Sequence, residues 1–264
     1  MLEVLNEKIV EMESLSLDII KMTIYSSQIA QNILPGQFVN IKCEDGINAY
    51  LRRPISVCDI DKINNTVDFV FQVKGKGTFA LAMKRAGDYV DLMGPLGTGF
   101  DVSEKYKNII VLGGGIGISP LLNLLKESHA TTKKAILGFR NKRAIVLDAE
   151  FLSASDDLII CTDDGSYGRE GFVTEALKDS LETEDADIIY VCGPEGMIKR
   201  AVDIANKYGV KCQVSMEQRM GCGIGACLVC VCKTVDDAHP DGWDYSHVCK
   251  HGPVFWSQEV IFDD

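Results

Sequence analysis

Four cysteines close to the C-terminal end of the chain have a spacing that suits a metal centre. Cys222, Cys227 and Cys230 form the pattern C-x4-C-x2-C, and Cys249 follows as a fourth thiol. Plant-type 2Fe-2S sites have this spacing, because four thiolates must reach two iron atoms. Closely spaced glycines let such a loop wrap the cluster and point backbone N–H groups at it: Gly221, Gly223 and Gly225. The sequence therefore predicts a 2Fe-2S cluster held by these four cysteines.

Zinc is the alternative occupant of a four-cysteine site. A structural zinc site prefers two tight pairs of ligands, whereas here four residues separate Cys222 from Cys227 and Cys249 stands alone. The spacing favours iron–sulfur over zinc. Cys232 follows Cys230 by two positions and could in principle substitute as a ligand. We expect Cys232 to be a bystander.

A glycine-rich segment in the middle of the chain has the composition of a phosphate-binding turn. The sequence GGGIGISP follows a β-branched apolar run and precedes an apolar, helix-like run. Such a turn lets the backbone approach a pyrophosphate at the positive end of a helix. A glycine-rich turn without a ligand is the alternative. The candidate nucleotide-binding residues are Gly113, Gly114, Gly115 and Gly117.

Two aspartates in the segment CTDDGSYG indicate which nucleotide would bind. Asp163 and Asp164 directly follow a predicted strand. A carboxylate in that place accepts hydrogen bonds from ribose hydroxyls and repels a 2′-phosphate. We therefore expect NAD and select Asp163 as the ribose ligand, although both residues are also common turn formers. Arg140 and Arg143 keep NADP open as an alternative.

Composition and charge exclude several other functions. The chain has 264 residues, of which 46% are apolar, and a net charge of -11. This acidity and the lack of a basic block disfavour nucleic acid as a partner. The uncharged run from Asn108 to Leu125 is broken by glycines and Pro120, so it does not predict a membrane span. The first residues contain no apolar signal segment, and we expect a cytoplasmic protein.

Three successive segments must position these residues. Residues 1–100 contain short strand-like stretches and one helical stretch, GTFALAMKR, which predict an antiparallel β-barrel. Residues 101–217 alternate strand-like and helix-like runs, which predicts a doubly wound parallel nucleotide-binding domain. Residues 218–264 are too few and too irregular for a core of their own, so we expect a small segment held together by the cluster.

The order of the motifs identifies a resemblance to known proteins. The barrel, RRPIS, GGGIGISP, CGPEGM and the cysteine loop follow one another along the chain. This order resembles the ferredoxin reductase family, and over the whole length it is similar to the electron-transfer subunits of NAD-dependent dihydroorotate dehydrogenases of type B. The resemblance implies an oxidoreductase subunit with a ferredoxin reductase-like barrel that binds FAD.

The resemblance also implies roles for individual residues. The R-x-Y-S/T element of the reductases corresponds to RRPIS, with isoleucine in place of the tyrosine that would stack on the flavin. A cysteine of the CGPEGM element would lie near the nicotinamide ring; a buried structural cysteine is the alternative. The implied flavin residues are Arg53, Pro54, Ile55, Ser56, Val70, Phe71, Gln72, Gly77 and Thr78, and the implied nicotinamide residues are Cys192, Gly193 and Pro194.

These cofactors together suggest an electron relay. Nicotinamide exchanges two electrons as hydride and a 2Fe-2S cluster exchanges one, so a flavin must lie between them. The resemblance implies a separate FMN-containing catalytic subunit that oxidises dihydroorotate in pyrimidine biosynthesis, in a heterotetramer of two plus two chains. A flavin subunit of an NAD(P)H:ferredoxin or sulfide oxidoreductase is the nearest alternative. An iron–sulfur redox sensor is a more distant one.

Overall fold

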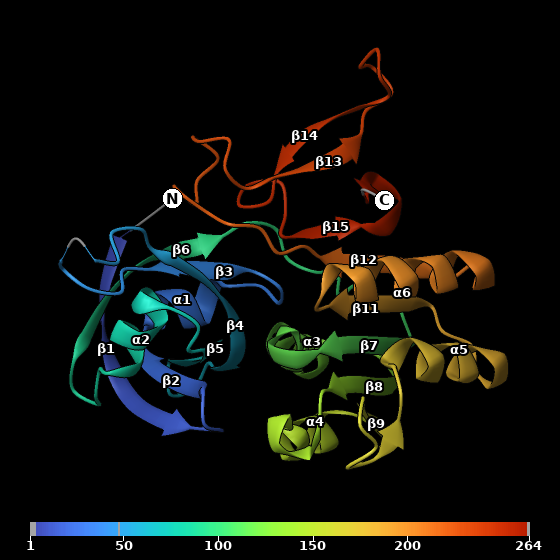
Figure 1. Ribbon diagram of the computed structural model, residues 1–264, viewed down its shortest axis with the longest axis horizontal. Helices are drawn as coiled ribbons and strands as arrows, with labels where there is room; N and C mark the ends of the chain where they lie inside the picture. The colour runs from blue at the N-terminus through green and yellow to red at the C-terminus, as the bar shows by residue number, and fades with distance from the viewer. Residues whose placement is uncertain (1–3, 47, 263–264) are drawn as a thin grey trace.

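The first part of the chain forms a closed antiparallel barrel. The computed structural model describes residues 4–46 and 48–262, and Figure 1 shows the barrel beside the second half of the chain. Around the barrel the strands follow the order β1-β2-β5-β4-β3-β6. Their bounds are β1 Val4–Ser14, β2 Ile19–Tyr25, β3 Phe38–Ile41, β4 Arg53–Asp61, β5 Thr66–Gln72 and β6 Tyr89–Leu96. The predicted barrel is therefore confirmed.

Side chains of β3 point alternately into the barrel and outward to the rest of the molecule. Val39 and Ile41 are fully buried in the barrel interior together with Phe69 of β5. Phe38 instead belongs to an apolar core shared with the nucleotide domain and the C-terminal segment. Because successive side chains of a strand point to opposite faces, Asn40 lies on the same outer face as Phe38. This face of β3 is the one that the rest of the molecule covers.

Two short helices connect the barrel strands, where the sequence indicated one. α2, Lys76–Ala82, overlaps the predicted helical stretch GTFALAMKR but starts one residue earlier and ends three residues sooner. α1, Ser27–Asn32, begins after Ser26, whose side chain accepts a hydrogen bond from the backbone N–H of Ile29 at 3.2 Å. Six residues are too few to produce a recognisable helical period. Only the serine N-cap signals this helix.

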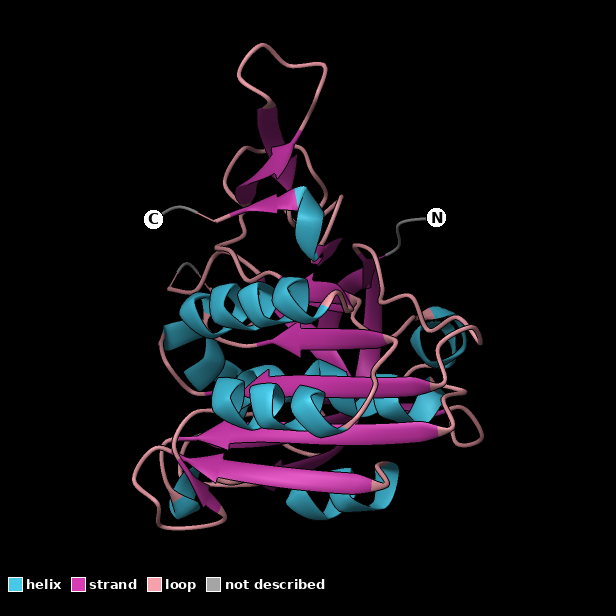
Figure 2. Cartoon of the chain, turned by 90° about the vertical axis from the view of Figure 1, so that its right-hand side faces the viewer, coloured by secondary structure: helices cyan, strands magenta, loops and turns pink. Residues whose placement is uncertain are grey.

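The second part of the chain is a parallel sheet with helices on both faces. Its strands are β7 Asn108–Gly114, β8 Thr132–Phe139, β9 Asp157–Thr162, β10 Arg169–Glu170, β11 Ile188–Cys192 and β12 Lys211–Ser215, in the order β10-β9-β8-β7-β11-β12. α3 Ser119–Glu127 and α4 Asp148–Ala154 pack on one face. α5 Val173–Thr183 and α6 Glu195–Tyr208 pack on the other, as Figure 2 shows. The predicted doubly wound topology is confirmed.

The strand order of this sheet shows where a ligand would be expected to bind. β7, the first strand of the domain, is central, and the chain then proceeds outward through β8 and β9 before it returns to β11 on the other side. The order therefore reverses between β7 and β11. In open α/β sheets, ligands bind beyond the carboxyl ends of the strands at such a reversal.

The C-terminal segment lies above both domains in Figure 1. β13 Val231–Val235, β14 Trp243–His247 and β16 Val260–Ile261 form a small antiparallel sheet. β15, Val254–Trp256, joins the large sheet instead and pairs antiparallel with β12. Apolar residues of this segment, including Val248 and Val260, belong to the same core as α5 and α6. The segment thus borrows its core from the nucleotide domain.

Direct contacts also join the barrel to the nucleotide domain. α3 packs along β4, Lys126 of α3 forms an ion pair with Asp59 of β4, and Glu127 pairs with Lys62 at 2.5 Å. These ion pairs are partly exposed, so each contributes about 1 kcal/mol or less. Within the described residues, no helix has the length and apolar character needed to cross a membrane.

Candidate functional site

The loop that begins at Cys222 directs backbone N–H groups at sulfur atoms. The Cys222 Sγ accepts hydrogen bonds from the N–H groups of Ile224 at 3.4 Å, Ala226 at 3.3 Å and Cys227 at 3.4 Å. The Cys249 Sγ accepts one from Gly225 at 3.1 Å. Donors in this arrangement stabilise negative charge on sulfur. The loop is therefore shaped to hold thiolates.

The four predicted ligands form two contacting pairs. Cys222 is hydrogen-bonded to Cys227, and Cys249 to Cys230. Although burial acts in the opposite direction, the backbone donors lower the pKa of Cys222 to about 6. Burial and the neighbouring Cys230 raise the pKa of Cys249 to about 12. Metal binding displaces these protons, because only thiolates act as ligands.

This pairing fits a two-iron cluster better than a single ion. Each iron atom of a 2Fe-2S cluster takes two thiolates, which matches the pairs Cys222–Cys227 and Cys230–Cys249. Over residues 4–46 and 48–262, no three Cys, His, Asp or Glu side chains converge as a single ion would require. Cys232 lies in the strand β13, where burial raises the pKa of its thiol to about 11.

The predicted glycine loop lies at the point where the order of the large sheet reverses. Gly113 at the end of β7 pairs with Cys192 at the end of β11. A Cβ atom on Gly117 would lie 2.7 Å from the Gly193 Cα, so this glycine is needed for close packing of the two loops. Gly115 has a φ of +56° and open space where a Cβ would be. Backbone at this position is therefore accessible to a ligand.

The glycine loop differs in one respect from the predicted strand-turn-helix. A 3-10 turn, η1 Gly115–Ile118, separates β7 from α3. The helix therefore starts at Ser119, four residues later than a direct turn at Gly115 would place it. Pro120 follows in the first turn of α3, where proline fits without loss of a hydrogen bond.

Cys192, Gly193 and Pro194 lie together on the other side of this opening. Burial raises the pKa of the Cys192 thiol to about 12, against a hydrogen bond with Ser215 on β12. The thiol is therefore neutral near pH 7. Gly193 has a φ of +155°, and a Cβ there would lie 3.0 Å from the Gly114 N. The predicted pyrophosphate loop and the predicted nicotinamide motif are thus in contact through their glycines.

The two aspartates at the end of β9 have different environments. The Asp164 Oδ1 accepts a hydrogen bond from the Ser166 N–H at 3.0 Å, and the bonds with Ser166 lower the pKa of Asp164. Asp164 therefore stabilises the turn. Asp163 uses its backbone N–H to bind the Phe139 carbonyl at 3.0 Å, and its side chain is exposed. The Asp163 carboxylate is therefore exposed to solvent and, unlike that of Asp164, does not stabilise this turn.

Both arginines of the NADP alternative lie close to the same edge. Arg140 directly follows β8, and Arg143 lies in the turn η2 Lys142–Ala144; both side chains are exposed. The Lys142 N–H donates to the Ser166 Oγ at 2.8 Å, which links this loop to the acidic loop. The two arginines and the two aspartates thus lie in loops that this bond joins at one edge of the sheet.

The barrel brings Arg53 and Gly77 together. A Cβ atom on Gly77 would lie 2.8 Å from the Arg53 Nε, so a larger residue there would displace the guanidinium. Thr78, next in α2, uses its hydroxyl within the helix cap: it accepts from the Lys74 and Gly75 N–H groups at 3.0 and 3.2 Å. Its backbone remains the part that can contact a ligand.

The remaining predicted flavin residues divide between two faces. Ile55 and Phe71 belong to the barrel core, so their side chains point away from a ligand on the outer surface. Val70 packs with the nucleotide domain, and the Gln72 Nε2 donates to Asp18 at 2.5 Å. Pro54 and Ser56 lie opposite Asn40 and Phe38 of β3, on the outer face. The outer face of β4 can therefore line a flavin. Ile55, which replaces the tyrosine of the reductases, contributes no side chain to this face.

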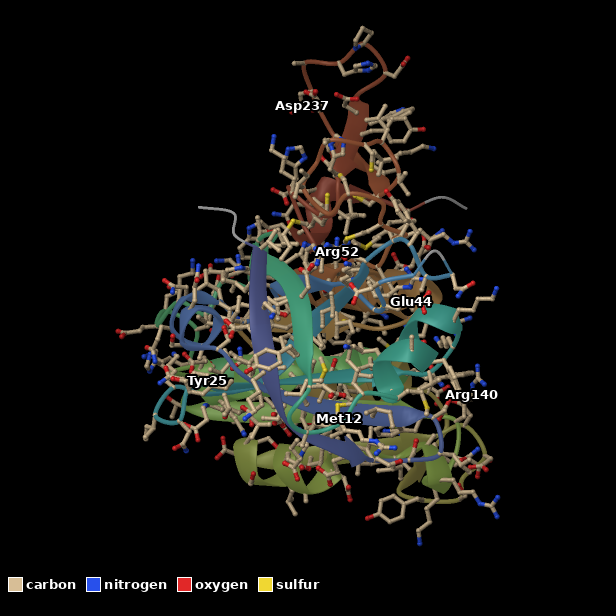
Figure 3. The ribbon with its side chains drawn as sticks, turned by 90° about the vertical axis from the view of Figure 1, so that its left-hand side faces the viewer. Met12, Tyr25, Glu44, Arg52, Arg140 and Asp237 are labelled. Atoms are coloured by element: carbon tan, nitrogen blue, oxygen red, sulfur yellow. The ribbon has the colours of Figure 1, made fainter. Side chains whose placement is uncertain are left out.

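Two barrel residues next to the cysteine loop were missed by the sequence analysis. Arg52 forms an ion pair with Asp91 at 2.8 Å and donates to the Asn40 carbonyl at 3.3 Å. It lines a groove whose other side consists of Gly221 and Cys222, and Figure 3 labels it where the barrel meets the C-terminal segment. Asn40 itself is fully buried. An asparagine within the apolar stretch FVNI was the signal available in the sequence.

The fold and these three sites define an oxidoreductase of the ferredoxin reductase type. Residues 111–203 match the model of the oxidoreductase NAD-binding domain, and residues 217–261 match that of the iron–sulfur cluster binding domain of dihydroorotate dehydrogenase B. The chain belongs to the family of electron transfer subunits of dihydroorotate dehydrogenase B (NAD(+)). This bears out the resemblance seen in the sequence.

The relatives that support this assignment cover nearly the whole chain. The electron transfer subunit from Bacillus cereus (strain Q1) is 38% identical over 99% of this chain and 100% of its own length. That from Caldanaerobacter subterraneus subsp. tengcongensis is 40% identical over 86% of this chain and 87% of its own length.

Solved structures show the same fold. A chain of the NADH-dependent reduced ferredoxin-NADP oxidoreductase, studied for flavin-based electron bifurcation, is 31% identical and has a TM-score of 0.84 over 97% of this chain and 89% of its own. A ferredoxin NADP+ reductase from Neisseria gonorrhoeae, with bound FAD and NADP, is 19% identical and has a TM-score of 0.66 over 78% of this chain and 92% of its own. The second likeness supports the fold of the barrel and nucleotide domain.

Proposed function

We propose that this chain carries electrons from an FMN-containing dihydroorotate dehydrogenase subunit to NAD, with a 2Fe-2S cluster and FAD as its bound carriers. The observation that supports this most strongly is the placement of the candidate cluster site and the candidate flavin site next to one strand, β3. Phe38, on the outer face of β3, packs into the apolar core that includes the C-terminal segment. β3 also pairs with β4 along residues Arg53 to Ser56. The relatives described above point the same way.

The chemistry of the relay comes from the groups that this chain would hold. When bound, a 2Fe-2S cluster exchanges single electrons, nicotinamide exchanges hydride, and FAD links the two. Cys222 and Cys227 would hold one iron, and Cys230 and Cys249 the other. The N–H groups of Ile224 to Cys227 would stabilise the negative charge of the thiolates.

The flavin site that we propose is the outer surface of β4 and the start of α2. Arg53 would bind the pyrophosphate through its guanidinium, next to the backbone of Gly77 and Thr78. Pro54 and Ser56 would line the ring system, with Val70 at the boundary to the nucleotide domain. Ile55, Phe71 and Gln72 would contribute backbone groups only, because their side chains are otherwise engaged.

The nucleotide site that we propose is the opening between β7 and β11. Gly115, which is exposed, would face the pyrophosphate, and Gly113, Gly114 and Gly117 would let the loop pack closely beneath it. The exposed carboxylate of Asp163 would bind the ribose. Cys192, with Gly193 and Pro194, would lie at the nicotinamide. Because its thiol is neutral, Cys192 would act through contact and orientation and not as a base.

We place the partner subunit against the cysteine loop. The large apolar side chains exposed there and on the facing barrel loop are Tyr50, Leu51, Ile224, Leu228 and Val229. The same two loops form the groove between barrel and cysteine loop. Apolar side chains exposed together are typical of protein interfaces. A two-fold symmetric pair of such heterodimers would give the two-plus-two assembly.

The cytoplasm is the compartment that suits this chemistry. All ten cysteines are free thiols in the structure. Such a content of unpaired cysteines is typical of a reducing compartment, and we propose that the assembly works there.

The test is reconstitution with the FMN subunit encoded in the same organism. We expect the purified complex to reduce NAD when dihydroorotate is added, and the Cys249→Ser complex to lose this activity while its flavin remains. The alternative is a reductase that acts on ferredoxin, which the 31% identical oxidoreductase chain favours. Reduction of ferredoxin by NADH without any dihydroorotate-dependent activity would establish that alternative.

A further inference from the structure

Asn40 is a fully buried amide whose polar atoms have no partner in the chain. Its side chain is 0% exposed, and among the described residues neither Nδ2 nor Oδ1 has a hydrogen-bond partner. Leaving a buried amide unpaired costs about 1–3 kcal/mol for each group. An apolar residue of similar volume would avoid this cost. An asparagine here therefore indicates a partner that the polypeptide itself does not supply.

The position of Asn40 indicates where this partner lies. Asn40 is on the outer face of β3, opposite Pro54 of β4 and Met93 of β6. The residue that covers it is Gly223, directly after Cys222, in the loop that wraps the predicted cluster. A Cβ atom on Gly223 would lie 2.5 Å from the Asn40 Nδ2. The amide and the cysteine loop are thus in direct contact, and the φ of +75° at Gly223 also favours glycine.

The chemistry of the amide limits the kind of partner. An NH2 group donates, and both thiolate and sulfide sulfurs only accept. Nδ2 is the Asn40 atom nearest to the position that a Cβ of Gly223 would occupy, at 2.5 Å. A buried water is the alternative partner, and it would need several further polar groups around it. Arg52 binds only the backbone carbonyl of Asn40 at 3.3 Å, so it leaves the amide group unsatisfied.

We propose that the Asn40 side chain donates a hydrogen bond from the barrel to a sulfur atom of the 2Fe-2S cluster and thereby raises its reduction potential. This inference rests on the proposed function, since it requires the cluster. A donor to a cluster sulfur stabilises the additional negative charge of the reduced form. Asn40 would in this way let the flavin-binding barrel set the potential of a carrier held by another segment.

The test measures the potential of the cluster in Asn40→Leu and Asn40→Ser variants of the full chain. Leucine keeps the volume without a donor, and the serine hydroxyl is too short to reach. Redox titration followed by EPR should show a lower midpoint potential in both variants, with an altered EPR spectrum. We expect the ratio of reduced to oxidised cluster at a fixed potential to fall about tenfold, which equals about 59 mV for one electron.

A matched control is available within the chain. Asn123 on α3 is also buried, at 1% exposure, and its Nδ2 is likewise unpaired among the described residues. Asn123→Leu should leave the cluster potential and EPR spectrum unchanged. In cluster-free protein, Asn40→Leu should be at least as stable to urea as the wild type, because it removes an unsatisfied amide.

Four results would overturn the proposal. An unchanged cluster potential in variants that retain full iron and sulfide would exclude the hydrogen bond. A shift of the flavin potential alone would mean that the amide binds FAD. Loss of iron from both variants with flavin retained would mean that Asn40 supports the loop and does not tune the cluster. Reduced stability of the cluster-free leucine variant would reveal a partner within the chain. Absence of iron from the wild type would instead contradict the proposed function.

Discussion

The guanidinium of Arg53 lies against Gly77, where even a methyl group would come within 2.8 Å of Nε. Arg53 starts β4 and Gly77 belongs to α2, so this contact closes a small cradle between two elements of the barrel. A cation beside the start of a helix is a combination that binds phosphate.

Replacement of Arg53 by alanine should weaken flavin binding. Loss of a charged hydrogen bond to phosphate removes about 2 kcal/mol, or roughly thirtyfold in affinity. The measurement is the flavin-to-protein ratio after purification, followed by FAD titration. Arg85→Ala, at an exposed position outside the cradle, should keep full flavin. Full occupancy in Arg53→Ala would refute the assigned role.

Replacement of Cys249 by serine should remove or destabilise the cluster but spare FAD. Cys249 pairs with Cys230 and accepts a hydrogen bond from the Gly225 N–H, so its loss leaves one iron with an incomplete ligand set. Iron, acid-labile sulfide and visible absorbance report the result. Cys232→Ser is the control and should retain the cluster, because that thiol lies on β13. If Cys249→Ser kept its iron and Cys232→Ser lost it, the ligand set would need to be reassigned.

Replacement of Asp163 by serine should reduce the preference for NADH over NADPH. The exposed carboxylate repels a 2′-phosphate, and its removal should raise kcat/KM for NADPH roughly tenfold relative to NADH. Asp164→Ser should change this ratio little and mainly loosen the turn that contains Ser166. The opposite ranking of the two variants would transfer the role to Asp164.

The Cys192 thiol should not contribute to the pH profile of hydride transfer. Its pKa is raised to about 12 by burial, so the group stays protonated from about pH 6 to pH 9. Cys192→Ala should lower the rate of NADH oxidation by a dye acceptor, because nicotinamide is held less closely, but by the same factor at each pH. A factor that changes across this range would show that the thiol ionises in the working enzyme.

Removal of the Tyr190 hydroxyl should destabilise the nucleotide domain. This hydroxyl donates to the Asp101 carbonyl at 2.6 Å, and the ring makes an edge contact with Phe100. Tyr190→Phe would leave that carbonyl without its donor and lower the free energy of unfolding by about 1–2 kcal/mol. Urea denaturation measures this value. Tyr208→Phe removes a hydroxyl that contacts only an exposed Glu182 and should change stability by less than about 0.5 kcal/mol.

Sequence patterns predicted the elements that have a local periodicity. The barrel strands β2 to β6 and most of the alternating strands and helices after Lys107 were recognisable from alternation and apolar runs, but α4 and the two-residue strand β10 were not predicted. The first strand, β1, was missed, because its eleven residues are largely polar and only Ile9 is fully buried. The pairing of β15 with β12 was also missed, since a three-residue strand carries no pattern and depends on tertiary contact.

For the candidate sites too, the sequence predicts the residues that belong to a local motif and misses those that depend on tertiary contacts. The four candidate ligand cysteines, the glycine loop and Arg53 could be proposed from the sequence because spacing or motif encodes their chemistry. The inward side chain of Ile55 could not be found, because its orientation depends on the barrel register with Val39. Asn40 and Arg52 are far in sequence from the cysteines, and only the folded chain brings them to the loop.

The attachment of the cluster segment has a consequence for the dynamics of the relay. β15 is hydrogen-bonded into the large sheet, and Thr98 at the exit of the barrel binds the Gly252 carbonyl at 2.6 Å. A carrier on a flexible tether must search for its donor and acceptor, and its rate then depends on linker length. Here the segment that carries the cluster site is hydrogen-bonded to both domains, so the distance between this site and the other two is set when the chain folds.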